Sequence, residues 1–294
     1  MGSSLIGTFG ERLAEAVRRN DSLLCIGLDP DPVRLPAEMQ DSTDLPGAIV
    51  AFNAAVVDAT ADLVCAYKPN LAFYLAHGAA GIAALEATRR RIPEEIPVIL
   101  DAKFGDVAST CEGYATAAFD TWGFDAVTVN PYLGEDALAP FLRRGDRGTI
   151  VLSKTSNPGS ADFQDLDIAN GGASHRTLAL TVAERVQAWT ARWPATLGLV
   201  VGATYPGELA EVRGSCPDLP ILLPGVGAQG GDLEGSLRAG LTATGQGLIV
   251  NASRGVIYAR GDEARWIDAV RAEASRLREA IDAVRDAEHQ PAPA

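Results

Sequence analysis

Lysine is nearly absent from this 294-residue sequence, since only three of its 25 basic residues are lysine. Lys68, Lys103 and Lys154 each end an apolar, strand-like run: LVCAYK, VILDAK and TIVLSK. A sequence that uses lysine rarely could contain these three lysines by chance. Arginine stays permanently protonated, however, whereas a partly buried lysine can give up a proton. Lysines that stand only at the ends of three expected strands therefore indicate chemistry.

Cysteines are also few, and none of the four forms a C-x-x-C pair: Cys25, Cys65, Cys111 and Cys216. This pattern predicts reduced, buried cysteines of a cytoplasmic protein rather than a disulfide framework or a zinc site. The first twelve residues lack a charged segment followed by an apolar one, so no signal peptide is expected. The longest uncharged stretch, 69–85, is interrupted by Pro, Asn, His and Gly and is too short to span a membrane.

Basic residues are too few for a nucleic-acid partner. Against 25 basic residues stand 38 acidic ones, which gives a net charge of −13. Such a surface repels phosphodiester backbones. If the ligand is itself an anion, its site must be a local cluster of basic groups.

Short apolar runs alternate with amphipathic segments along the whole chain. Strands are expected at 23–28, 63–67, 98–102, 126–129, 149–153, 197–201, 221–223 and 247–250. Helices are expected at 9–19, 46–62, 78–91, 107–121, 135–144, 177–192, 207–213, 233–239 and 262–287. Apolar strands that are each followed by a helix indicate a parallel sheet covered on both faces. The pattern predicts a single-domain (β/α)8 TIM barrel over residues 1–294 with a disordered tail at about 288–294; a doubly wound open sheet is the alternative.

Ionisable residues gather where the first three strands end, and barrel active sites lie at that end of the strands. Asp29 follows the first strand, Lys68 follows the second, and Asp101, Lys103 and Asp106 follow the third. Asp106 alone would be explained as a helix N-cap. An acid and a base two residues apart on one strand share a face, and buried charges there must be paired.

Two loops near the end of the chain have the composition of a phosphate site. The loop 224–232 is rich in glycine and contains Gln229, and Ser253 and Arg254 follow the eighth strand. TIM barrels often bind phosphate with the loops after strands seven and eight. Together these loops predict a phosphorylated ligand.

These motifs resemble the orotidine 5′-monophosphate decarboxylase family. LDAKFGDVAST (100–110) matches its D-x-K-x-x-D-x-x-x-T signature, and LLPGVGAQGGD (222–232) and NASRGVIYA (251–259) are similar to its loops. TSNPGS (155–160) and VGATYPGEL (201–209) resemble a longer branch of the family seen in actinobacteria-like sequences. Phe104 departs from that branch, which more often has a basic residue there.

The resemblance implies a role for each matching residue. It implies a catalytic charge network of Lys68, Asp101, Lys103 and Asp106, in a homodimer whose subunits share their sites through Asp106 and Thr110. The implied substrate contacts are Asp29 to the ribose hydroxyls, Ser156 to the pyrimidine, Pro224 in the closing loop, and Gln229, Arg254 and the backbone near Ser253 to the phosphate. Lys154 matches no role, and we interpret it as a charge on the rim beside the fifth strand.

The implied reaction converts orotidine 5′-monophosphate to UMP and CO₂, the last step of de novo UMP synthesis, with no cofactor and no metal. One alternative is a Mg²⁺-dependent phosphosugar synthase or decarboxylase of the same suprafamily, which binds the metal through a Glu from strand two. Lys68 at that position disfavours a divalent cation. A non-catalytic nucleotide-binding barrel is the other alternative, and it would not need Lys103.

Overall fold

Eight parallel strands form one ring in the computed structural model, which describes residues 7–40, 43–168, 176–226, 232–260 and 265–289. The strands are β1 (Leu24–Ile26), β2 (Ala66–Tyr67), β3 (Ile99–Phe104), β4 (Ala126–Val129), β5 (Gly148–Lys154), β6 (Thr196–Val201), β7 (Ile221–Pro224) and β8 (Leu248–Ala252). Their order in the sheet is β2-β1-β8-β7-β6-β5-β4-β3. Each strand therefore lies beside the next or the previous strand in the chain, and the first strand, β1, also pairs with the last, β8, as in a (β/α)8 barrel.

The ring closes between β2 and β3 through two isolated parallel bridges, Tyr67 with Val98 and Asn70 with Asp101. The amide of Asp101 also donates to the carbonyl of Pro69 at 2.9 Å. An open sheet would leave these two edges unpaired. The structure thus confirms the predicted barrel, and we call the β2–β3 junction its seam.

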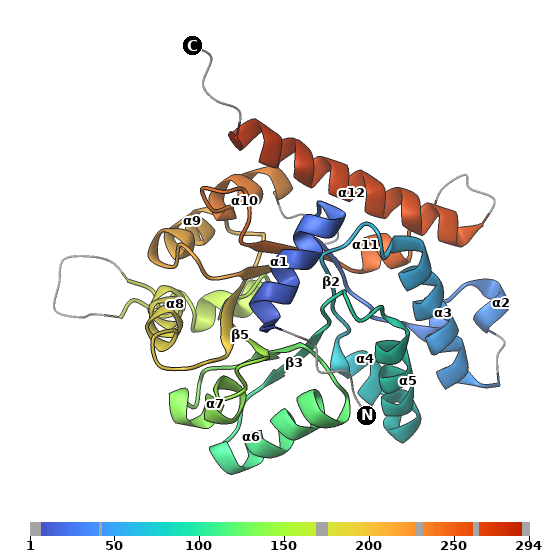
Figure 1. Ribbon diagram of the computed structural model, residues 1–294, viewed down its shortest axis with the longest axis horizontal. Coiled ribbons are helices and arrows are strands. Elements are labelled where there is room, and N and C mark those ends of the chain that lie inside the picture. The colour runs from blue at the N-terminus through green and yellow to red at the C-terminus, as the bar shows by residue number, and fades with distance from the viewer. Residues whose placement is uncertain (1–6, 41–42, 169–175, 227–231, 261–264, 290–294) are drawn as a thin grey trace.

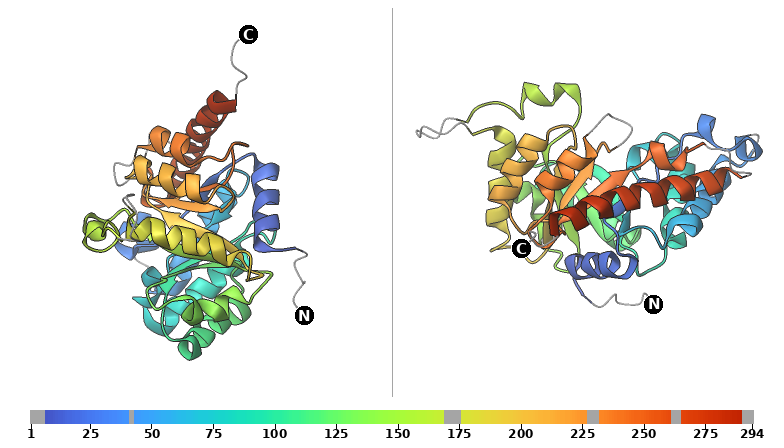
Figure 2. Two further views of the ribbon diagram at one scale, coloured as in Figure 1. Left: turned by 90° about the vertical axis from the view of Figure 1, so that its left-hand side faces the viewer. Right: turned by 90° about the horizontal axis from the view of Figure 1, so that it is seen from above.

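Helices surround the ring (Figure 1). The longer ones are α1 (Phe9–Asn20), α3 (Leu45–Thr60), α5 (Gly78–Arg91), α6 (Ala108–Ala115), α7 (Glu135–Leu142), α8 (Leu178–Trp189), α9 (Pro206–Ser215), α10 (Leu233–Gly240) and α12 (Trp266–His289). Helix α1 begins with a capping box, in which Thr8 and Glu11 each accept a hydrogen bond from the other's backbone amide. It packs across the end of the barrel where the strands begin, and α12 runs along one side (Figure 2).

Several local details differ from the sequence prediction. The helix expected at 107–121 is α-helical only to Ala115 and continues as a π-helix over Thr116–Thr121. Short helices that were not predicted follow strand ends: α4 (Leu71–Leu75) after β2 and α11 (Arg254–Ile257) after β8. Helix α12 continues to His289, so the tail predicted from residue 288 is wrong for its first two residues; a contact between Glu288 and Arg238 of α10 holds that end. Residues 290–294 lie outside the described residues.

A buried ion cluster ties the N-terminal end of the barrel together. Asp125, at the start of β4, is only 1% exposed and contacts three guanidinium groups: Arg12 at 3.0 Å, Arg89 at 3.3 Å and Arg147 at 3.8 Å. Its carboxylate also accepts the amide of Val98 at 2.9 Å. Because Arg12 lies in α1, Arg89 in α5 and the other three residues immediately before β3, β4 and β5, the cluster fixes the starts of these strands against the two helices.

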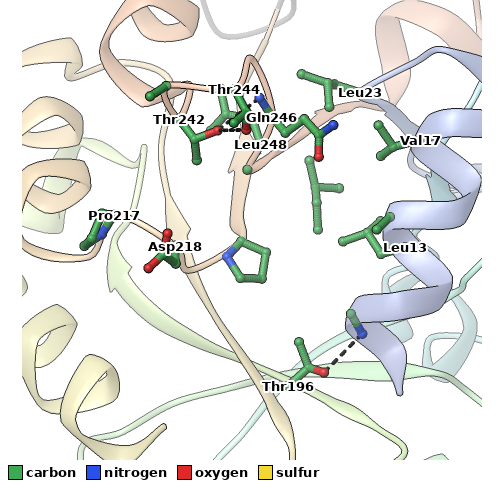
Figure 3. A pocket seen from close by; sticks show the side chains of 16 residues that line it. Leu13, Val17, Leu23, Thr196, Pro217, Asp218, Thr242, Thr244, Gln246 and Leu248 are labelled. Atoms are coloured by element: carbon green, nitrogen blue, oxygen red, sulfur yellow. Dashed lines mark hydrogen bonds between the residues drawn. The ribbon is translucent and has the colours of Figure 1, made fainter. Parts of the chain in front are cut away.

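A cavity of about 500 Å³ lies at the same end of the barrel, between α1 and the starts of β6 and β8 (Figure 3). Leu13 and Val17 of α1 line it, and the amide of Gly10 donates to Thr196 Oγ1 beside it at 3.1 Å. Its lining is largely apolar, with Gln246 among its few polar groups. It lies across the barrel from the charged strand ends and is not a candidate for their chemistry.

Candidate active site

The strand that carries the signature motif is bulged where the charges stand. Leu100 pairs with Val127, but the next paired residue on β3 is Phe104, opposite Val129, so three residues of β3 face one residue of β4. Within this bulge Lys103 has φ +52°, in the left-handed region. A non-glycine residue there costs about 1–3 kcal/mol, and such strain is concentrated at functional sites.

Thr128 of β4 supports the bulge. Its hydroxyl oxygen accepts the amides of Ala102 and Lys103, each at 3.0 Å, in place of the ladder bonds that the bulge breaks. The hydroxyl itself donates to Asp101 Oδ1 at 2.9 Å. One side chain thus satisfies the irregular backbone and orients the central carboxylate. Sequence analysis missed Thr128, although it lies within the predicted strand next to the motif.

Asp101 joins two lysines in a single network. Its Oδ2 lies 2.9 Å from Lys68 Nζ and its Oδ1 lies 2.5 Å from Lys103 Nζ. The Lys68 and Asp101 side chains are 4% and 11% exposed, whereas that of Lys103 is 44% exposed. Lys103 is therefore the cation of the network that a ligand can reach.

Lys68 and Asp101 are both ionised at neutral pH. Burial alone would lower the pKa of Lys68, but the carboxylates of Asp101 and Asp29 outweigh it and raise that pKa above its usual value. Burial would raise the pKa of Asp101, but Lys68 and Lys103 outweigh it and hold the pKa of Asp101 well below its usual range. A fixed anion therefore keeps two cations in place.

Asp29 lies on the other side of Lys68. Its Oδ1 accepts the amide of Asn70 at 3.0 Å, and its Oδ2 accepts the hydroxyl of Ser253 at 2.6 Å. The Asn70 side chain reaches Asp101 Oδ2 at 3.4 Å and so connects the two carboxylates. Sequence analysis missed Asn70. Its position two residues after Lys68, on the same face of the extended chain, was the available signal.

Asp106 and Thr110 lie apart from this network. Within the part of the chain that the structure describes, no ion pair joins Asp106 to Lys68 or to Lys103. The alternative explanation of Asp106 as a helix N-cap does not hold, because Val107 is the N-cap of α6 and the Asp106 side chain accepts the amide of Val107 at 2.7 Å. Thr110 is exposed on the first turn of that helix.

Lys154 is not the rim charge that we expected. Its side chain is 1% exposed, at the end of β5, and it forms an ion pair with Asp165 and lies over the ring of Tyr205, 4.6 Å from the centroid. Lys154 is buried because the loop after β5 folds back over the end of the strand. The periodicity of the strand sequence does not show this fold of the loop. Ser156, two residues further on, is partly buried.

The residues expected to bind phosphate lie at the ends of β7 and β8. Pro224 is the last residue of β7 and pairs with Asn251 of β8, which places the two loops side by side. Arg254 is exposed at the start of α11, and no described residue forms a hydrogen bond or an ion pair with its guanidinium. Gln229 lies outside the described residues.

The cysteines are buried and form no disulfide, as predicted. Burial raises the pKa of Cys25 to about 12, which leaves its thiol protonated and unreactive.

In the ranges that the structure describes, no three His, Cys, Asp or Glu side chains are grouped so as to hold a metal ion. Within the same ranges, no helix is both long and apolar enough to cross a membrane.

Comparisons with known proteins agree with the motifs. A family model described as "Orotidine 5′-phosphate decarboxylase / HUMPS family" matches residues 22–269. A protein of Thermomicrobium roseum named orotidine 5′-phosphate decarboxylase is 56% identical over 278 residues, which cover 95% of this chain and 96% of that protein. One of the same name from Roseiflexus castenholzii is 54% identical and covers 94% and 97%.

A solved structure titled as the OMP decarboxylase of Leishmania donovani superposes with a TM-score of 0.81 at 41% identity, covering 95% of this chain and 99% of that one. The resemblance drawn from the sequence motifs is confirmed. The chain belongs to the orotidine 5′-phosphate decarboxylase family and is an enzyme of that family.

Proposed function

We propose that this enzyme decarboxylates orotidine 5′-monophosphate to UMP and CO₂ without a cofactor, as a carbon–carbon lyase in the last step of de novo UMP synthesis. The observation that carries the proposal is the Lys68–Asp101–Lys103 network. In it a buried ion pair, Lys68 with Asp101, holds one accessible ammonium, that of Lys103. Family membership supports the same reaction.

The chemistry requires such a cation. When the bond between C6 and the carboxylate breaks, CO₂ leaves and an electron pair stays on C6 with no adjacent group to delocalise it. A positive charge fixed beside C6 stabilises that pair. Lys103 would then transfer a proton from its ammonium to C6, which gives UMP and a neutral amine. Asp101 holds Lys103 in position, and Lys68 balances the charge of Asp101.

The remaining site residues would bind the parts of the substrate that do not react. Asp29, oriented by Asn70 and Ser253, lies where it can accept hydrogen bonds from ribose hydroxyls. Arg254 would bind the phosphate with Gln229, and Ser156 would contact the pyrimidine beside Pro224. Binding energy from the phosphate can hold C6 against Lys103.

A spectrophotometric assay of the purified protein on orotidine 5′-monophosphate, with and without EDTA, tests the reaction. We expect turnover that EDTA leaves unchanged. Loss of turnover on chelation, restored by Mg²⁺, would favour the phosphosugar enzyme. UMP binding with no turnover would favour the non-catalytic barrel.

The unpaired cysteines fit a reducing compartment such as the cytoplasm.

We also propose that the enzyme is a homodimer with shared sites. Among the described residues Asp106 has no ion pair with a lysine of its own subunit, and apolar side chains are exposed nearby: Val107, next in the chain, and Tyr132 and Leu133 in the loop after the neighbouring strand β4. Tyr132 is 82% exposed, which is unusual for a large ring on a monomer surface. A second copy placed there would cover these side chains and bring its Asp106 to the network.

Subunit mixing tests the shared site. Asp106→Ala and Lys103→Ala dimers should each be nearly inactive. After the two are unfolded and refolded together, about half of the dimers should be mixed, and each mixed dimer has one intact site, so about a quarter of wild-type activity should return. If mixed dimers are confirmed by mass and no activity returns, each site belongs to one subunit.

A further inference from the structure

Lys154 is a buried cation that the proposed reaction does not use. Its ammonium contacts Asp165, from the loop between β5 and α8, and the ring of Tyr205, from the loop between β6 and α9. Among the described residues its only carboxylate partner is Asp165, which is itself 41% exposed. An apolar side chain of similar size would avoid the desolvation cost, so such a pair is weak evidence of a role in stability.

The neighbouring contact shows what the ion pair holds. Gln164 precedes Asp165, and its Oε1 accepts the amide of Thr155 at 2.8 Å. Its Nε2 donates to Thr155 Oγ1 at 2.8 Å. Two consecutive residues of the loop thus bind Lys154 and Thr155, the two residues that immediately precede Ser156.

The other side of Ser156 is supported by the end of β6. The amide of Gly202 donates to the carbonyl of Lys154 at 2.9 Å. A Cβ on Gly202 would lie 2.9 Å from both the Cβ and the amide nitrogen of Ser156, so only glycine fits there. Ser156 is therefore held between the β6 end and the segment that Gln164 and Asp165 bind.

We propose that Lys154 is a positioning residue for pyrimidine recognition: paired with Asp165 and covered by Tyr205, it fixes the backbone that presents Ser156 to the base. This inference rests on the proposed function, since it takes the Ser156 contact from there. It gives the third lysine a role in binding the base, distinct from those of Lys68 and Lys103 in the reaction.

Binding of UMP and of ribose 5-phosphate, measured by calorimetry, separates positioning from general support of the fold. Both ligands carry the phosphate and the ribose, but only UMP carries the base. We expect Lys154→Met and Asp165→Asn to weaken UMP binding by about tenfold to a hundredfold, since a misplacement of about 1 Å has effects of this size. Ribose 5-phosphate binding should stay within about twofold, and KM for the substrate should rise more than kcat falls.

Arg176→Met is the matched control. It removes an ion pair between the loop that follows β5 and α8, Arg176 with Glu184 at 3.0 Å, and among the described residues neither side chain has a hydrogen bond or ion pair with residues 154–156. Both affinities should stay as in the wild type. Asp165 is partly exposed, so Asp165→Asn decides the question even if Lys154→Met does not fold.

Ser156→Ala separates failure of the inference from failure of the proposed function. If Ser156→Ala leaves the ratio of the two affinities unchanged, the role of Ser156 in the proposed function is wrong, and the inference falls with it. If Ser156→Ala changes that ratio and neither Lys154→Met nor Asp165→Asn does, only the inference is wrong. Equal weakening of both ligands in these two variants would also overturn it, because that is the effect of a structural role.

Discussion

The two ends of the barrel each bury a carboxylate among cations, but they use different cations. At the N-terminal end Asp125 is surrounded by Arg12, Arg89 and Arg147. At the C-terminal end Asp101 is held by Lys68 and Lys103. Arginine forms planar, multiple hydrogen bonds and keeps its proton, whereas a lysine ammonium is a compact charge that can donate one.

The difference extends to the backbone. The Asp125 carboxylate accepts the backbone amide of Val98, just before β3, and none of the residues of that cluster has a positive φ. The Asp101 network lies in a bulge, with Lys103 in the left-handed region. In a chain with 22 arginines and three lysines, arginines surround the carboxylate that supports the fold, and two of the three lysines hold the carboxylate at the end where a proton is needed.

Removing the reachable lysine should have the largest effect of any change at either end. Lys103→Ala takes away both the charge beside C6 and the proton donor, so kcat should fall by about 10⁴-fold or more. UMP binding should stay within about tenfold, because the charge acts on the transition state. Steady-state assays and calorimetry measure the two. Retained turnover would show that another group protonates C6.

Removing the carboxylate at the opposite end should change stability and not chemistry. Asp125→Ala leaves buried guanidinium groups without a counter-charge and should lower the free energy of unfolding by about 3–5 kcal/mol. Urea denaturation measures this loss, and kcat of the folded protein should not change. Asp120→Ala is the control, because its pair with Arg144 is exposed and should contribute below about 1 kcal/mol. Equal losses of stability in Asp125→Ala and Asp120→Ala would mean that burial does not increase the contribution of the Asp125 cluster.

The support of the bulge should have an intermediate effect. Thr128→Val leaves the amides of Ala102 and Lys103 without an acceptor and should cost about 1–3 kcal/mol of stability, together with a fall in kcat. Thr149→Val, on the adjacent strand, is the matched control, since its buried hydroxyl has no partner among the described residues. A control that loses as much as Thr128→Val would show that side-chain shape, not the hydroxyl, is what matters.

The smallest effect is the dependence on pH, and its sign follows from the two pKa shifts. The folded protein lowers the pKa of Asp101, so ionised Asp101 contributes to the free energy of unfolding above its ordinary pKa of 3.8. That contribution is lost as pH falls below this value. The folded protein raises the pKa of Lys68, so protonated Lys68 contributes to the free energy of unfolding below its ordinary pKa of 10.5. That contribution is lost as pH rises above this value. The stability difference between wild type and Asp101→Asn should therefore be greatest between these values.

On either side that difference should shrink by at most about 1.4 kcal/mol per pH unit and titrating group. Urea titrations across the pH range test it. A difference that stays constant down to the lowest pH at which both proteins fold would contradict the charge pairing.

Patterns local in the sequence predicted most of the fold and part of the site. The predicted bounds of β4 and α5 agree with the structure, because apolar runs and the arginines at the end of α5 mark them within the segment itself. Contacts between distant segments could not be read in this way. The burial of Lys154 depends on Asp165 and Tyr205, and the bulge at Lys103 depends on Thr128 of the next strand.

The seam has a consequence for how binding and folding are linked. Among the residues that the structure describes, two isolated bridges close the ring between β2 and β3, and one of them joins Asn70 to Asp101. The side chains of these two residues also belong to the active-site network. A ligand that contacts Asp29 and Lys103 engages the two groups that Asn70 and Asp101 hold, so occupancy and ring closure are coupled equilibria. A ligand at about 100 times its Kd adds about 2.7 kcal/mol to the stability of the state that binds it. In this enzyme that energy is delivered at a junction where two isolated bridges stand in place of a continuous ladder.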